Sequence, residues 1–123
     1  MQKKYSNSDK KQFELAQKYS KAGDFKNSKM IMEELVSQNP DSSVFHAVLA
    51  NAYWDMKKIE LAISEFKKAV ELSPQSETAS LGLLHCLWGE GNEEEALEEM
   101  KRFVANSHSS EYEVILKSIL EKS

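Results

Sequence analysis

The sequence repeats itself every 34 residues, and this period restricts the fold more than any other feature of the chain. Pro40 and Pro74 lie one period apart, as do Tyr19 and Tyr53. Four further sets recur over three periods: Leu15, Leu49 and Leu83; Ser28, Ala62 and Ala96; Met32, Phe66 and Met100; and Val36, Val70 and Val104. Chance rarely produces so many coincidences, so the period indicates an array of repeated units that are stabilised by stacking on one another.

Each period is predicted to form two helices. In the second period, residues 43–56 carry apolar side chains at helical spacing, and residues 59–72 carry a second such stripe. Pro74 closes the unit, because proline has no backbone donor and discourages the helical conformation of the residue before it. In the first and third periods Gly23 and Gly91 lie between the helices, where glycine allows the first helix to end sharply.

Short polar residues at the expected helix starts are predicted to act as N-caps, since their side chains accept hydrogen bonds from free backbone N–H groups. Asp24 and Asn92 follow the two glycines, and Asn92 with Glu95 has the spacing of a capping box. Ser43 and Ser76 are expected to cap the first helices of the second and third periods.

The composition agrees with a folded helical protein and excludes several classes. Of the 123 residues, 41% are apolar and 29% are charged, whereas a disordered chain would have fewer apolar residues. The single cysteine rules out an intrachain disulfide, and a net charge of −4 is not that of a general nucleic-acid binder. Because no apolar run is long enough for a signal peptide or a membrane span, we expect a cytoplasmic protein with no membrane partner.

The repeat closely resembles the tetratricopeptide repeat family. The resemblance rests on residues 15–25 (LAQKYSKAGDF), residues 49–59 (LANAYWDMKKI) and the two spaced prolines, and it covers about residues 7–108. The sequence also departs from the family pattern. Lys57 replaces the glycine between the helices, His108 replaces the third proline, and three residues stand where the family favours tryptophan, namely Gln12, His46 and Ser80.

The resemblance implies an all-α fold, a right-handed α-solenoid of three helix–turn–helix hairpins followed by a C-terminal capping helix. We expect one domain over residues 1–123, with repeats at about 7–40, 41–74 and 75–108 and the capping helix at about 110–122. The tail has Tyr112, Ile115, Leu116 and Ile119 at helical spacing, which favours a helix that covers the end of the third repeat. A docking helix for a second copy of the chain is the alternative.

In this family the first helices of the hairpins line a concave groove that holds peptides or helices of partner proteins. By resemblance, twelve residues are candidates for peptide binding: Phe13, Gln17, Lys21, Val44, Ala47, Asn51, Trp54, Asp55, Thr78, Leu81, His85 and Trp88. Trp54 and Trp88 are one period apart, so they are expected to lie near each other on adjacent helices. Tryptophan suits a binding hot spot, although both rings could instead pack inside the core.

One binding mode of the family is not expected here. Members that grip acidic chaperone tails carry Lys and Asn in the first repeat, Asn in the second and basic residues in the third. The matching residues are Phe13, Gln17, Asn51, Thr78 and Gly82, of which only Asn51 fits. The charges that would pair with a terminal carboxylate are therefore missing.

Charge is distributed unevenly along the chain. Residues 1–40 carry a net charge of +3, residues 41–74 of −1, residues 75–108 of −5 and residues 109–123 of −1. Five acidic residues crowd one predicted helix: Glu93, Glu94, Glu95, Glu98 and Glu99. They form either a solvated face, favoured by the helix dipole, or a patch that attracts a basic partner.

Signals for catalysis, metal binding or a cofactor are weak. His85 and Cys86 are adjacent, so on a helix they point about 100° apart and cannot form a nucleophile–base pair. The three histidines, His46, His85 and His108, do not have metal-ligand spacing, and no glycine-rich phosphate loop is present. We therefore expect neither an enzyme nor a bound metal or cofactor.

The leading hypothesis is a protein–protein interaction module, adaptor or chaperone-like, that holds a peptide or helix of a partner in its groove. Two alternatives remain open. The chain could be an immunity-type inhibitor that neutralises a folded basic partner, or a structural subunit that self-associates, for instance as a weak homodimer.

Overall fold

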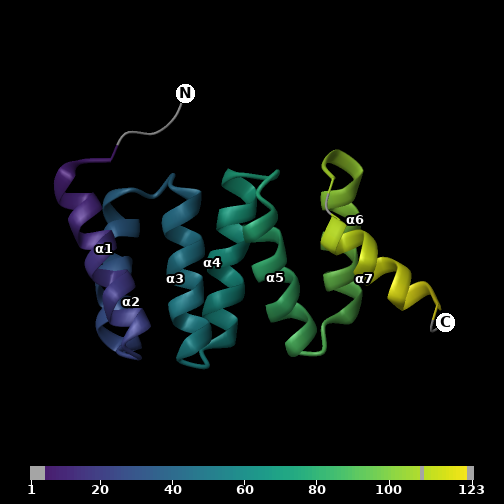
Figure 1. The fold of residues 1–123 in the computed structure, drawn as a ribbon, viewed down its shortest axis with the longest axis horizontal. Coiled ribbons are helices and arrows are strands. Elements are labelled where there is room, and N and C mark those ends of the chain that lie inside the picture. Colours follow the sequence, from purple (N-terminus) through teal and green to yellow (C-terminus); the bar gives the residue numbers. More distant parts are fainter. Residues whose placement is uncertain (1–4, 109, 122–123) are drawn as a thin grey trace.

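A row of helices makes up the structure, a computed structural model that describes residues 5–108 and 110–121, and only the backbone of residue 120. Within these ranges the chain has seven helices and no strand. The helices are α1 (Asn7–Lys21), α2 (Phe25–Gln38), α3 (Ser43–Asp55), α4 (Ile59–Leu72), α5 (Glu77–Gly89), α6 (Glu93–Asn106) and α7 (Ser110–Glu121). They follow one another along the long axis, with α1 at one end and α7 at the other (Figure 1). The expected all-α fold of three hairpins and a final helix is confirmed.

The hairpins are α1–α2, α3–α4 and α5–α6, and α2 and α4 also pack against the first helix of the next hairpin. The small residues of the repeat are almost fully buried: Ala16, Ala50, Ser28, Ala62 and Ala96. Short side chains let two helices approach closely, so the small residues at the 34-residue spacing explain why the same hairpin forms in each repeat. None of the described helices has the length and apolar character needed to cross a membrane.

The turns between paired helices all use the left-handed backbone conformation. Gly23 and Gly91 have φ angles of 82° and 80°, and Lys57, at the equivalent place in the second hairpin, has a φ of 61°. A residue with a Cβ atom is strained in this region, whereas glycine is not. The turn geometry is therefore kept in the second hairpin even though its glycine is absent.

The predicted caps are partly confirmed. The Asp24 carboxylate accepts from the backbone N–H of Asn27, and the Ser76 hydroxyl accepts from that of Ala79. The prediction for Ser43 is wrong, because Ser42 caps α3. Asn92 occupies the predicted N-cap position of α6, but its side chain makes no cap hydrogen bond. Ser43 instead donates its hydroxyl to the carbonyl of Ala69 at 2.9 Å, which ties α3 to the end of α4.

The last helix, α7, runs obliquely to the others and covers the end of the third hairpin (Figure 1). Tyr112 holds it there. Its ring is fully buried and meets Phe103 edge-on at 5.3 Å between ring centres, while its hydroxyl lies 2.6 Å from Oγ of Ser80. The cap expected at about residues 110–122 therefore forms over 110–121, and residue 122 lies outside the described residues.

Candidate functional site

The twelve residues expected to bind a partner lie on the first helices of the hairpins, α1, α3 and α5, whose shared surface is called the inner face below. Seven of them are exposed polar, charged or aliphatic side chains, namely Gln17, Lys21, Val44, Asn51, Asp55, Thr78 and His85. Phe13 and Leu81 are half-buried and Ala47 is buried, and all three pack against the core. The remaining two, the tryptophans, are about two-fifths exposed.

A hollow of about 220 Å³ with a mixed polar and apolar lining lies between α1, α2 and α3. Its lining includes Gln17, Lys21 and Asn51, three of the predicted residues, which the structure thus brings together. The hollow combines one ammonium group with two side-chain amides. Such a set can donate hydrogen bonds to peptide carbonyls or to a carboxylate, and the amides can also accept from peptide N–H groups.

The two tryptophans belong to neighbouring helices and neither is sealed inside the core. Trp54 on α3 is 38% exposed and Trp88 on α5 is 43% exposed. The Trp54 ring reaches α5, since a Cβ atom on Gly89 would lie 3.5 Å from its Cη2 atom. Both indoles therefore belong to the same end of the inner face, as their spacing of one period predicts.

A second hollow, of about 440 Å³, lies beside Trp88 and is mainly apolar. It is lined by the inner-face residues His85 and Trp88 together with residues of α5, α6 and α7: Leu84, Met100, Val114, Ile115, Ser118 and Ile119. The contribution of α7 to this hollow was missed in the sequence, where its apolar stripe was assigned to covering the third repeat or, alternatively, to docking a second copy. The signal was present in Val114, which falls outside that stripe and is 68% exposed.

Four other residues predicted to bind a partner, Phe13, Asp55, Val44 and Thr78, lie apart from the two hollows. The ring of Phe13 packs on Phe45 of α3, at 5.4 Å between ring centres, which joins the first two repeats. Partial burial raises the pKa of the Asp55 carboxyl above its ordinary value. Val44 and Thr78 lie in the first turns of α3 and α5, away from the tryptophans near the ends of these helices.

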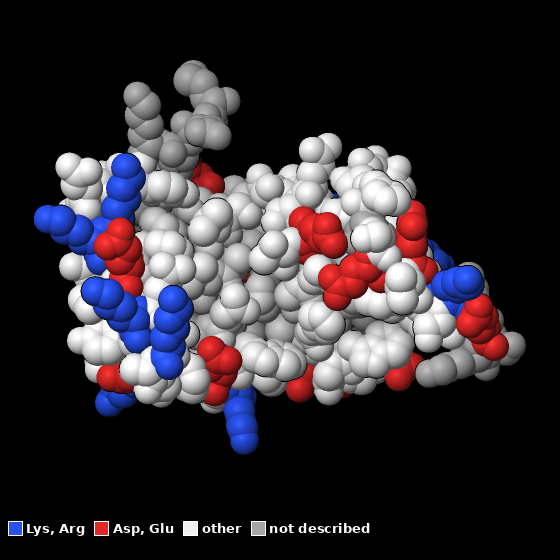
Figure 2. All heavy atoms as spheres, in the orientation of Figure 1, with Lys and Arg blue, Asp and Glu red and all other residues white. Residues whose placement is uncertain are grey.

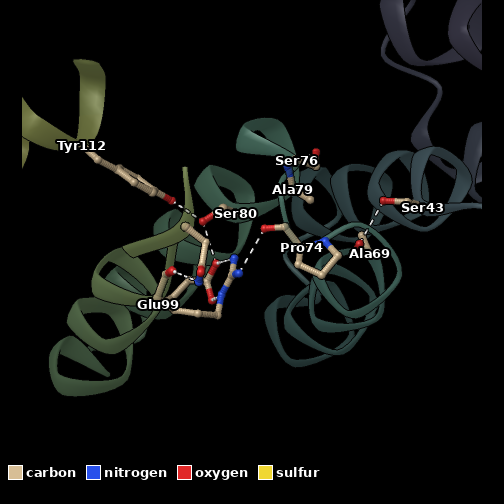
Figure 3. A network of polar contacts seen from close by, with 10 residues as sticks. Ser43, Ala69, Pro74, Ser76, Ala79, Ser80, Glu99 and Tyr112 are labelled. Carbon is tan, nitrogen blue, oxygen red and sulfur yellow. Dashed lines mark hydrogen bonds and ion pairs between the residues drawn. The ribbon is translucent and has the colours of Figure 1, made fainter. Parts of the chain in front are cut away.

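Two residues that stand in place of the family's tryptophan form buried polar contacts instead. The ring of His46 lies between Oε2 of Glu65, 2.6 Å from Nδ1, and the carbonyl oxygen of Pro40, 2.8 Å from Nε2. In the next repeat, Oγ of Ser80 donates to Oε2 of Glu99 at 2.6 Å (Figure 3). These contacts connect the two helices of a hairpin and have a structural role.

One of the five clustered glutamates does not belong to the solvated or partner-binding surface that the sequence suggested. Glu99 is only 8% exposed, and besides Ser80 it accepts two hydrogen bonds at 2.7 Å from Arg102. Arg102 also donates to the carbonyl of Pro74 at 3.0 Å, which links the third hairpin to the end of the second (Figure 3). Glu95 pairs with Lys67 at 2.9 Å, and the other three side chains are exposed.

The single cysteine is inaccessible. Cys86 is buried, and its burial, followed by the negative charge of Glu90, raises the pKa of the thiol to about 11. The thiol is therefore not a nucleophile at neutral pH. No cluster of three His, Cys, Asp or Glu side chains with metal-site geometry occurs among the described residues.

Charge also varies along the row of helices. Figure 2 shows Lys and Arg side chains gathered at the end that contains α1, Asp and Glu side chains more frequent toward the other end, and little charge between them. The surface charge thus follows the change from the basic first repeat to the acidic third repeat.

Comparisons with known proteins agree with this architecture. Residues 45–76 match the sequence model of the tetratricopeptide repeat. The first TPR of Spaghetti (RPAP3), solved with the HSP90 peptide SRMEEVD, is 22% identical, with coverage of 96% of this chain and 94% of that chain and a TM-score of 0.79. The Sgt2 TPR domain from Aspergillus fumigatus is 15% identical, with coverage of 95% and 80% and a TM-score of 0.80.

MamA from Desulfovibrio magneticus is also similar in structure, at 19% identity and a TM-score of 0.75. The match covers 80% of this chain but 56% of the MamA chain, so this chain spans little more than half of that relative. No curated protein matches the sequence. The matched central segment and the helical architecture together show that this chain carries a tetratricopeptide repeat and has the fold of tetratricopeptide-repeat domains.

Proposed function

We propose that this chain is a protein–protein interaction module, adaptor or chaperone-like, whose inner face binds a peptide or helix of a partner protein. The observation that carries the proposal is the pair of half-exposed indoles, Trp54 and Trp88, at one end of that face. Large rings with an N–H donor and few rotamers are typical anchors of protein interfaces. Burying them in a complex would remove apolar surface from water at little cost in side-chain entropy.

The two hollows support the same function because their chemistries differ. The hollow between α1, α2 and α3 offers Lys21, Gln17 and Asn51, which suit a peptide backbone or a carboxylate. The hollow beside Trp88 is mainly apolar and suits a large aliphatic or aromatic side chain. A segment lying along the inner face would therefore meet polar groups at one end and an apolar anchor site at the other.

The structurally similar Spaghetti domain was solved with an acidic peptide, SRMEEVD, and this peptide is a useful comparison. We do not expect it to bind tightly here. Phe13 is packed on Phe45, and Gly82 lies against the ring of Phe66, so neither position supplies a cation for the peptide carboxylates.

Selection from a displayed random-peptide library would test the proposal. Enriched peptides should bind the wild-type protein and lose at least about tenfold in affinity when both Trp54→Ala and Trp88→Ala are present. A matched control is Leu72→Ala, because Leu72 is a similarly exposed large apolar residue on α4, outside the inner face. Far-UV circular dichroism of each variant shows whether the fold is retained.

The proposal fails if no peptide is enriched, or if the enriched peptides bind the folded tryptophan double variant as well as the wild type. Binding of SRMEEVD with an affinity equal to that of the selected peptides would contradict the specificity argued above. An equal loss of affinity in Leu72→Ala would show that the binding surface has been assigned to the wrong face.

A second candidate function is favoured by one observation, a surface hollow of about 350 Å³ lined by Glu93, Glu94, Glu95 and Glu98 at the start of α6. This acidic surface suits an inhibitor that covers a folded basic protein. Such a partner would bind with a strongly salt-dependent association rate and would not be replaced by short peptides. Charge reversal of Glu93 and Glu94 would weaken binding of this basic partner, whereas the tryptophan substitutions would leave it unchanged.

A further inference from the structure

The free side of α1 is a stacking surface that no described helix covers. At the same position in successive repeats, Leu49 is 3% exposed and Leu83 is 5% exposed, but Leu15 is 39% exposed. The reason is topological: α3 packs against α2 and α5 against α4, whereas α1 begins the row. Leu15 therefore marks the surface on which a preceding element of the array would stack.

Two lysines flank Leu15 on this surface. Lys11 occupies the position of the buried residues Phe45 and Ala79, and Lys18 occupies that of the buried residues Ala52 and Cys86. On a helix, Lys11, Leu15 and Lys18 have the spacing i, i+4 and i+7 and so share one side. We call these three residues the N-terminal stacking face; it is an apolar side chain between two positive charges.

The opposite end of the molecule presents the complementary pattern. Along α7, Glu111, Val114, Ser118 and Glu121 are all exposed and follow helical spacing, and we call them the C-terminal stripe. Val114 is the most exposed of the large apolar side chains among the described residues, at 68%. The stripe is thus an apolar side chain between two negative charges.

We propose that the N-terminal stacking face of one copy binds the C-terminal stripe of a second copy, so that chains associate head to tail. The contact would bury Leu15 and Val114 and place lysines opposite glutamates. The net charges of the two ends of the chain favour the same contact. Residues 1–40 carry +3, while residues 75–108 carry −5 and residues 109–123 carry −1.

The arrangement cannot be a symmetric dimer. The two surfaces lie at opposite ends of the row of helices, so one pair of copies uses one surface from each and leaves the other two free (Figure 1). The contact is therefore heterologous, and assembly continues into open chains or closes into a ring. Pairing of two identical ends would bring like charges together. The C-terminal stripe shares Val114 and Ser118 with the apolar hollow beside Trp88, so a second copy bound there would compete with a peptide side chain in that hollow.

Sedimentation velocity and light scattering over a range of concentrations provide the first test. The weight-average mass of the full chain should rise with concentration at low salt, and association should weaken several-fold when the salt concentration is raised from about 0.05 M to about 0.5 M. A mass that stays at the monomer value throughout, or that reaches a dimer and stops, overturns the proposal.

Charge exchange between two variants makes the test specific. Lys11→Glu with Lys18→Glu gives a chain with two acidic ends, and Glu111→Lys with Glu121→Lys gives a chain with two basic ends. Each variant alone should remain monomeric, and an equimolar mixture should recover association, because opposite ends again meet. All four residues are exposed, and circular dichroism verifies that the variants fold.

The matched control for the lysine variant carries Lys57→Glu and Lys58→Glu, which make the same change in net charge on exposed residues of the middle hairpin. This control should associate like the wild type. Association of either end variant alone, failure of the mixture to associate, or an equal loss in the control would each overturn the head-to-tail contact.

Discussion

Ser80 and Glu99 form a buried hydrogen bond of 2.6 Å between the two helices of the third hairpin. One repeat earlier, His46 and Glu65 make a contact of the same length at the equivalent positions. The carboxylate on the second helix thus reaches the residue that replaces tryptophan on the first. The first repeat has no such pair, and Gln12, at the equivalent position, lines an open hollow. Two of the three hairpins therefore use a polar contact where the family uses an aromatic ring.

Glu99→Ala is expected to lower the free energy of unfolding by about 2 to 3 kcal/mol, because it removes a charge-assisted acceptor shared by Ser80 and Arg102. The loss also leaves the Ser80 hydroxyl with one partner fewer in a buried place. Urea denaturation followed by circular dichroism measures the change.

Glu98→Ala is the control, since the neighbouring Glu98 side chain is exposed on the same helix. Its effect should stay within about 0.5 kcal/mol. Equal effects of the two substitutions would show that the buried carboxylate contributes no more than a surface glutamate.

The stability should also depend on alkaline pH through Tyr112. Burial is the main cause that raises its pKa from 10.0 to about 12, so the unfolded chain loses the phenolic proton first. The stabilisation is complete below pH 10 and is lost as the pH rises to about 12, a decrease of about 2 kcal/mol. The pKa of Tyr53 is also raised to about 12, mainly by burial. Ionisation of Tyr53 should therefore lower the free energy of unfolding further over the same pH range.

Comparison with Tyr112→Phe isolates the Tyr112 contribution. Because Ser80 gives its only hydrogen to Glu99, the tyrosine is the donor to Ser80, and removing the hydroxyl should cost about 1 kcal/mol near pH 8. At pH 12 the order should reverse, because phenylalanine has no proton to lose. Parallel stability curves for the two proteins between pH 8 and pH 12 would contradict this explanation.

The fold could be predicted from sequence because several independent signals agree on the same hairpin. The small residues, the prolines and the turn glycines each mark a different part of the repeat and share one period. Cap positions were less certain, since adjacent serines compete: Ser42 caps α3 while Ser43 reaches Ala69. Moving the helix start by one residue leaves the sequence pattern nearly unchanged, but it decides which serine caps the helix and which bonds to the neighbouring helix.

The environment of single polar residues could not be predicted in this way. Glu99 belongs to a run of acids on a helix and seemed solvated, but the small side chain of Ser80 leaves room for its carboxylate and Arg102 neutralises it. Likewise, the apolar hollow beside Trp88 forms only because α7 crosses at an oblique angle (Figure 1). Such features depend on distances between helices, which the period does not encode.

Replacing Lys57 by glycine should stabilise the protein by about 0.5 to 1 kcal/mol. Lys57 has a φ of 61°, a conformation in which its Cβ atom is strained, and glycine removes this strain. The gain is reduced by the larger conformational freedom of glycine in the unfolded chain. Thermal and urea denaturation should both report the increase.

The adjacent Lys58 provides the control, because its φ of −94° is an ordinary conformation for a residue with a side chain. Lys58→Gly should therefore leave the stability unchanged or reduce it. A stabilisation of similar size by both substitutions would mean that the lost positive charge, and not relief of strain, is responsible.

The α5 backbone at Gly82 lies against the core, where a Cβ atom would overlap the ring of Phe66 from the preceding hairpin. Gly82→Ala is expected to lower the free energy of unfolding by about 1 to 2 kcal/mol. The buried ring would have to move, at a cost that exceeds the gain of about 1 kcal/mol in helix propensity. Gly89→Ala on the same helix should instead be neutral or stabilising, since its Cβ atom would meet Trp54 at 3.5 Å, an ordinary contact distance. If urea denaturation showed both alanines to be stabilising, the contact of Phe66 with the α5 backbone would not be the reason for glycine at position 82.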